Sequence, residues 1–151
     1  MNLIKRIDQY NDNYLYFCDP IKNNIMNEGK FIRILYSTAY FTLNGIYLLI
    51  PLNEIQIEKY FNKYKCMFNI VEHREMIENI KCIEDSILKK VNIRNKIPLF
   101  KVYEQLRNGN IKIFDNVENS SNTNNHYFVL KISGIWETDM HYGLTFKFYK
   151  L

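Results

Sequence analysis

The sequence predicts a β-rich α+β domain, and three observations lead to that class. Hydrophobic and polar residues alternate on both sides of a short polar loop between Tyr127 and Leu151, a pattern typical of a β-hairpin with one buried face. One central segment repeats isoleucine at helical spacing, and β-branched and aromatic runs flank it. With 151 residues, 47% of them hydrophobic, the chain is expected to form a single domain, residues 1–151.

The first third of the chain is expected to form strands. Tyr14 to Cys18 is a short aromatic run closed by a turn signal, and Lys30 to Tyr36 is rich in β-branched and aromatic residues. A longer run, Tyr40 to Ile50, is predicted to be a strand that Pro51 stops. Gly45 inside it indicates a bulge or bend of the kind that curves a strand around a small barrel.

The middle of the chain changes period. Apolar residues at spacings of three and four predict a helix from Glu54 to about Tyr64, although its aromatic and β-branched residues leave a strand as the alternative. A stronger helical pattern follows, with glutamates at its start and lysines and arginine at its end, as the helix dipole favours. Its apolar positions are Ile77, Ile80, Ile83 or Glu84, Ile87 and Val91.

After Pro98 the pattern again predicts strands. Asn108-Gly109, the commonest sequence for a tight type I′ turn, separates two runs rich in strand formers, so Phe100 to Arg107 and Asn110 to Phe114 are expected to pair. The side chains expected on one face of this hairpin, with the last of them on the opposite strand, are Lys101, Tyr103, Gln105 and Lys112.

Asp115 to His126 is a polar, Asn- and Ser-rich linker without an apolar residue large enough to anchor it, and it is expected to be a mobile loop. The order of strands, central helix and strands fits a five-stranded Greek-key barrel of the OB type, which has a helix between its third and fourth strands and closes with a hairpin. The hairpin around Asn108-Gly109 and the helix after Asn53 would be additions to that barrel.

Composition and motifs argue against several functional classes. No nucleotide-binding, hydrolase or metalloprotease motif is present. The nearest candidate, Asp139 and His141 next to Glu137 in the terminal loop, lacks the ligand or orienting group that would complete a site, so a non-catalytic protein without cofactor or metal is expected. Three unpaired cysteines and the lack of a signal peptide or an apolar span indicate an intracellular, reducing compartment and no membrane association. The net charge of +4 is compatible with a polyanionic partner.

The polar face of the terminal hairpin suggests which polyanion the protein binds. It carries Lys131, Ser133, Lys147 and Tyr149, with Trp136 near the loop. Cations and flat rings on one surface are what single-stranded nucleic acid needs for phosphate contact and base stacking. The alternative is an ordinary solvated sheet face, which carries similar residues.

The same hairpin resembles a known family. The residues Lys131-Ile132-Ser133-Gly134-Ile135-Trp136 and Tyr142-Gly143-Leu144-Thr145-Phe146-Lys147 resemble the closing hairpin of phage-type single-stranded-DNA-binding proteins, which have relatives in nucleocytoplasmic large DNA viruses. The resemblance covers about 25 residues of the chain. It implies an OB fold and a DNA-facing surface that includes Lys131, Trp136, Tyr142 and Lys147.

Two functions follow as hypotheses. The first is a single-stranded-DNA-binding protein that acts without catalysis in viral DNA replication, repair or recombination and is able to self-associate. Its candidate binding residues are Lys101, Tyr103, Lys112, Lys131, Trp136, Tyr142, Lys147 and Tyr149. The second is a structural or assembly protein of a large DNA virus particle, in which the same β-rich surface meets protein, because Tyr, Trp and Phe also anchor protein interfaces.

Overall fold

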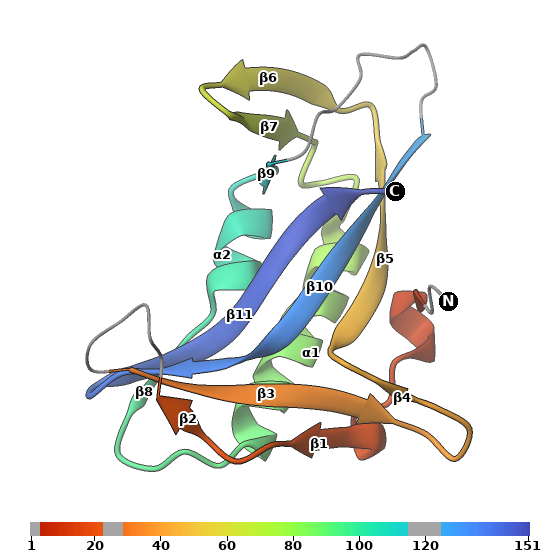
Figure 1. Cartoon of the computed structure of the whole chain (residues 1–151). Helices are drawn as coiled ribbons and strands as arrows, with labels where there is room; N and C mark the ends of the chain where they lie inside the picture. Colours follow the sequence, from red (N-terminus) through yellow and green to blue (C-terminus); the bar gives the residue numbers. More distant parts are fainter. Residues whose placement is uncertain (1–3, 23–28, 115–124) are drawn as a thin grey trace.

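The computed structural model describes residues 4–22, 29–114 and 125–151, which form a β-rich α+β fold with a sheet curled into a half barrel and two helices (Figure 1). The strands of the curled sheet are β1 (Leu15–Phe17), β2 (Ile21–Lys22), β3 (Lys30–Ser37), β4 (Thr42–Leu43), β5 (Ile46–Asn53), β8 (Ile97–Leu99), β10 (Asn125–Glu137) and β11 (His141–Lys150). A separate three-stranded sheet contains β6 (Gln56–Tyr60), β7 (Lys63–Met67) and β9 (Asn110–Ile113). The helices are α1 (Arg74–Lys90) and α2 (Lys101–Arg107), and two short 3-10 turns, Ile7–Gln9 and Asp12–Tyr14, precede β1.

The long strand β10 holds the curled sheet together. Along one edge its first half pairs with β5, from Asn125↔Asn53 to Ile132↔Ile46, and its second half pairs with β3, from Gly134↔Arg33 to Glu137↔Lys30. Along its other edge it pairs with β11. Because β3 and β5 share one edge of a single strand in succession, the sheet bends where one gives way to the other (Figure 1).

The concave side of this sheet is filled by the two helices. Ile80 and Ile87 of α1 pack with Leu48 of β5 and Leu130 of β10 in a continuous core, and all four are almost fully buried. Isoleucine at helical spacing on α1 and alternate apolar residues on each strand are the two patterns that produce such a core. Among the described residues, no helix has the length and apolar character needed to cross a membrane.

Several predicted elements are confirmed. The runs near Tyr14 and Lys30 form β1 and β3, the central isoleucine pattern forms α1, and the terminal alternation forms the β10–β11 hairpin. Glu84 occupies one of the two positions that the helical pattern left open, and it is buried with the isoleucines.

The predicted helix from Glu54 to Tyr64 is wrong, because this segment forms the β6–β7 hairpin. Tyr60 and Phe61 are exposed, whereas Ile57 and Tyr64 pack against the core from the two different strands. Phe61 has φ of +56°, a left-handed conformation that turns the chain and that a helix cannot accommodate. The apolar residues of this segment are therefore spaced by three and four because they lie on a hairpin that buries one face of each strand.

The predicted hairpin around Asn108-Gly109 is also wrong, because its first arm is α2. A buried carboxylate on α1 stabilises the start of this helix: the two oxygens of Glu84 accept hydrogen bonds from the backbone N–H groups of Val102 (3.0 Å) and Tyr103 (2.9 Å). At the other end Gly109, with φ of +77°, donates its N–H to the Leu106 carbonyl. The glycine ends a helix here, as glycine commonly does.

Pro51 does not stop its strand, because β5 continues to Asn53. Among residues 4–22, 29–114 and 125–151, no strand neighbours the edge of β5 away from β10 at this point, so the missing N–H of Pro51 breaks no ladder bond there. On the same edge, Leu49 N–H donates to the Lys5 carbonyl and Asn53 N–H donates to Nε2 of His73. The predicted mobile loop lies outside the described residues, except that Asn125 and His126 begin β10.

Candidate nucleic-acid interface

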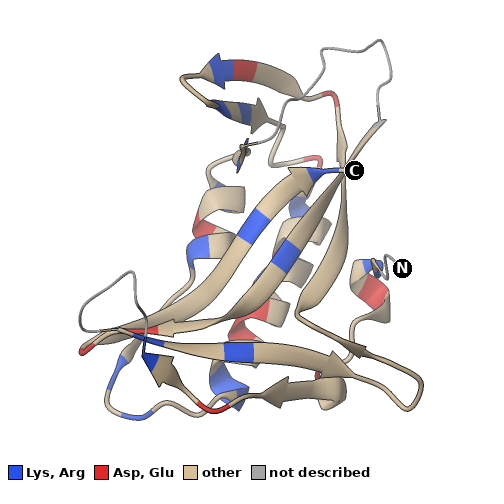
Figure 2. Ribbon diagram, viewed as in Figure 1, with Lys and Arg blue, Asp and Glu red and all other residues tan. Residues whose placement is uncertain are grey.

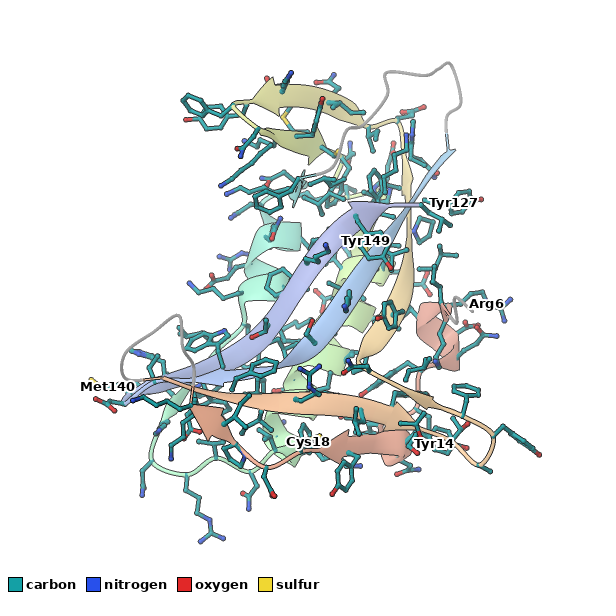
Figure 3. All side chains as sticks on the ribbon, in the orientation of Figure 1. Arg6, Tyr14, Cys18, Tyr127, Met140 and Tyr149 are labelled. Atoms are coloured by element: carbon teal, nitrogen blue, oxygen red, sulfur yellow. The ribbon has the colours of Figure 1, made fainter. Side chains whose placement is uncertain are left out.

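The side of the curled sheet turned away from the helices is an open face (Figures 1 and 3). Strand pairing defines its members, because directly opposite residues of antiparallel strands project to the same side. The open face consists of Phe31, Arg33, Tyr47, Leu49, Val129, Lys131, Gly134, Trp136, Gly143, Thr145, Lys147 and Tyr149. These residues include three cations and four rings but no carboxylate, and blue bands without red cross the middle of β3, β10 and β11 (Figure 2).

A bulge at Ser133 brings Trp136 to this face. Before the bulge Lys131 is opposite Lys147, and after it Gly134 is opposite Thr145 and Trp136 is opposite Gly143. The extra residue shifts the alternation by one, and without it Trp136 would point into the core. Ser133 itself is the inserted residue, which explains why it has no partner in the β10–β11 register.

Lys131 and Lys147 are directly opposite each other on neighbouring strands. Like charges in this position destabilise a sheet unless something neutralises them. Within the described parts of the chain, neither ammonium forms an ion pair, and each lies near a ring instead: Lys131 is 5.6 Å from the centre of Tyr47, and Lys147 is 5.8 Å from that of Tyr149. A bound anion such as phosphate would relieve the repulsion between the two ammonium groups.

Two glycines let rings lie against the sheet at the other end of the face. A Cβ on Gly143 would be 2.8 Å from Cζ2 of Trp136, and a Cβ on Gly134 would be 2.6 Å from Cζ of Phe31. Both rings therefore occupy the space directly above glycine Cα atoms. Arg33, 5.9 Å from the centre of the Phe31 ring, donates a hydrogen bond to Asn44 (2.7 Å), which orients its guanidinium. Rings held over the backbone in this way can present a flat surface to a base.

The second pair of rings, Tyr47 and Tyr149, lies beside the lysines. Burial raises the pKa of Tyr149, and the neighbouring Tyr47 adds to this effect. Val129, between their strands, is fully buried although it belongs to the open face and not to the helix-side core.

The structure brings four of the eight predicted binding residues together on this face: Lys131, Trp136, Lys147 and Tyr149. The other four lie elsewhere. Tyr142 shares the alternation of Leu144 and is 7% exposed within the core, so its ring is not available to a base. The remaining three are Lys112 on β9 of the separate sheet, and Lys101 and Tyr103 on α2.

Of the seven cations and rings of the face, sequence reasoning missed three: Phe31, Arg33 and Tyr47. Each alternates with buried isoleucine or leucine, Phe31 and Arg33 around Ile32, and Tyr47 between Ile46 and Leu48. That alternation indicates which side they occupy within their strand, but not that β3 and β5 both pair with β10. Without the pairing, they could not be assigned to the same surface as Lys131.

The loop group considered for metal binding does not form a site. Oε1 of Glu137 is 2.6 Å from Nζ of Lys96 in a half-buried ion pair, which uses the carboxylate that a metal would need. Across residues 4–22, 29–114 and 125–151, no three His, Cys, Asp or Glu side chains are grouped so that they could hold a metal ion.

Comparisons with known proteins give no relative from which a function could be transferred: no family model matches the sequence, and neither curated proteins nor solved structures contain a significant match.

Proposed function

We propose that this chain binds single-stranded DNA across the open face, without catalysing a reaction, and acts in viral DNA replication, repair or recombination inside the host cell. The observation that carries the proposal is the opposed pair Lys131 and Lys147, which has no carboxylate partner among the described residues and is flanked by rings at both ends. Phosphates would neutralise the lysines, and bases would stack on the rings.

The dimensions of the face suit a short stretch of strand. From Trp136 to Val129 the chain advances seven residues along β10, which is about 23 Å at roughly 3.3 Å per residue. This length is comparable with a site of about four nucleotides, the lower end of the range for one OB fold. Bases at the two ends of such a DNA strand would stack on the rings, and the phosphates between them would contact the cations.

An OB-type barrel remains part of the proposal. Its support is the long bent strand β10, the helix α1 that precedes the closing hairpin in the chain, and the hairpin motif that resembles phage-type single-stranded-DNA-binding proteins. The resemblance contributes Lys131, Trp136 and Lys147 to the proposed binding surface, whereas the buried Tyr142 departs from what it implies.

The test is the salt dependence of binding to labelled oligo-dT. If Arg33, Lys131 and Lys147 each neutralise one phosphate, log affinity against log salt has a slope of about −2, at ~0.7 per contact on a single strand. Lys131→Ala/Lys147→Ala should reduce the magnitude of this slope by about 1.4. The matched control, Arg74→Ala/Lys81→Ala, removes two exposed charges from α1 and should change the slope little.

Two results would overturn the proposal. One is equal, weak affinity for single-stranded and duplex oligonucleotides. The other is a folded Lys131→Ala/Lys147→Ala variant that retains the wild-type slope. Either result would favour the alternative of a particle structural protein that uses its β-rich surface to bind other proteins.

A further inference from the structure

The three-stranded sheet carries a second cationic surface that is separate from the open face. Its inner side is part of the core, where Cys66, Ile111 and Ile113 are fully buried. Its outer side belongs to the hairpin that projects at the top of the molecule in Figure 1 and carries the exposed side chains seen there in Figure 3. The outer side, called the finger face here, consists of Glu58, Tyr60, Lys63, Lys65, Lys112 and Phe114.

Lysines on the finger face are opposed in the same way as those on the open face. Lys65 of β7 is directly opposite Lys112 of β9, and Lys63 lies 5.2 Å from the centre of the Phe114 ring. Glu58, the one carboxylate of the finger face, is opposite Lys65 but makes no ion pair within the described residues. Three ammonium groups against one carboxylate leave an excess positive charge that the sheet itself does not neutralise.

The lysines of the finger face lie around a cavity. The cavity, of about 340 Å³, is lined by Glu58, Tyr60, Lys63, Tyr64, Lys65 and Lys112. A volume of this size lies at the lower end of the range for small-ligand sites and is large enough for a phosphate with part of its sugar. The lining therefore combines three cations with two tyrosine rings around a space that a nucleotide unit could enter.

The rings beside the cavity are unusually exposed. Tyr60 is 64% exposed and Phe114 is 61% exposed, and at the turn Phe61 is 82% exposed and contacts Tyr60 edge to face at 4.8 Å between ring centres. Exposed rings next to uncompensated lysines repeat the chemistry of the open face. A protein partner would be expected to meet such cations with carboxylates, whereas a nucleic-acid strand supplies phosphates and bases together.

We propose that the finger face is a second contact site for the same nucleic-acid strand, in which Lys63, Lys65 and Lys112 bind phosphate and Tyr60 or Phe114 stacks on a base. This inference rests on the proposed function and adds to it that the binding site is bipartite. Because the finger face and the open face lie on different sheets, only a strand longer than the one that fills the open face can touch both. Binding should therefore depend on oligonucleotide length in a way that one face alone would not produce.

The experiment compares oligo-dT of about 5 nucleotides, close to the smallest OB site, with oligo-dT of about 30 nucleotides. For wild-type protein the longer strand should show a steeper salt slope, by roughly 1.4 to 2 for two or three additional phosphate contacts. Lys65→Ala/Lys112→Ala should remove about 1.4 from the slope of the long strand and leave the short strand unchanged. The control variant Arg74→Ala/Lys81→Ala, which removes two exposed charges from α1, should behave as wild type with both lengths.

The outcomes separate this inference from the proposed function. If Lys65→Ala/Lys112→Ala binds the long strand with the wild-type slope while Lys131→Ala/Lys147→Ala loses slope, the finger face is not a nucleic-acid site and the open face still is. Should wild-type protein bind neither length, both proposals fail. A finger variant with unchanged DNA binding but an altered sedimentation coefficient would assign the finger face to protein contacts and would also overturn the inference. Thermal unfolding of each variant establishes that it is folded.

Discussion

Replacing Gly134 by alanine should destabilise the fold substantially, because this glycine allows β3 and β10 to approach each other. Its added Cβ would collide with the backbone carbonyl oxygen of Ile32 and would lie 2.6 and 2.7 Å from two ring carbons of Phe31. The backbone at Gly134 is not left-handed, so alanine is strained here by contact and not by φ. A side chain could rotate away from the new methyl group, but a ladder carbonyl cannot without opening the sheet.

The magnitude follows from two opposing effects. Alanine at a position with a compatible backbone normally stabilises a protein by about 0.4–1 kcal/mol, because it restricts the unfolded chain. Overpacking a tight site costs roughly 1–3 kcal/mol and occasionally more, and a collision with backbone belongs at the upper end. We therefore expect Gly134→Ala to lose about 2–3 kcal/mol net. In Gly143→Ala the shortest contact, 2.8 Å, is to the ring of Trp136, and the backbone carbonyl oxygen of Leu99 lies at 3.0 Å instead of colliding, so this variant should lose less, about 1–2 kcal/mol.

The assay is unfolding in guanidinium chloride, followed through the fluorescence of the single tryptophan of the chain. In both variants the free energy of unfolding should fall with denaturant concentration at the wild-type slope. The midpoint concentration of unfolding should be lower for Gly134→Ala than for Gly143→Ala. A Gly134→Ala protein as stable as wild type would refute the close approach of β3 and β10. A larger loss for Gly143→Ala than for Gly134→Ala would refute the assignment of the backbone collision to Gly134.

Two further predictions concern Glu84 and Trp136. Burial raises the pKa of Glu84 to about 7 and outweighs the two backbone N–H groups that favour its charged form. Because the folded state then holds this proton more tightly than the unfolded state, wild-type stability should fall by about 3 kcal/mol as pH rises from about 4.5 to 7, and Glu84→Gln should lack this component in pH-dependent denaturation. A Glu84→Gln protein with the wild-type pH dependence would contradict the assignment. Trp136→Ala should stay folded, since its ring lies outside the helix-side core, and should weaken oligo-dT binding by ~1–3 kcal/mol without changing the salt slope. Normal binding by the folded variant would exclude stacking on Trp136.

The elements that sequence reasoning predicted correctly are those with local, unambiguous patterns. Isoleucines and Val91 at helical spacing predicted α1, a run of β-branched and aromatic residues predicted β3, and alternation predicted the terminal hairpin. The failures depend on tertiary contacts. In Lys101–Arg107, Val102 and Tyr103 suit a strand and the other five residues suit a helix, and Glu84, 17 positions before Lys101 in the sequence, provides a cap for a helix there.

The candidate site was predictable in part for the same reason. Lys131 and Lys147 follow from alternation on two strands joined by a hairpin. Tyr142 could have been excluded, since it alternates in step with Leu144 and Phe146. Trp136 lies on the open face only because of the bulge at Ser133, which alternation alone does not reveal. That Lys112 lies apart from the open face could be recognised only from the structure, in which β9 pairs with β7 in the separate sheet.

Fluorescence of Trp136 during a titration with oligo-dT tests the central claim most directly, because the chain has one tryptophan and it lies on the open face. Binding is followed in parallel by the anisotropy of a label on the DNA. If bases stack on this face, Trp136 emission should be quenched along the same saturation curve as the anisotropy, and bound DNA should protect the ring from iodide. Saturable binding by anisotropy, with Trp136 emission and iodide access unchanged, would show that single-stranded DNA binds elsewhere and would contradict the account.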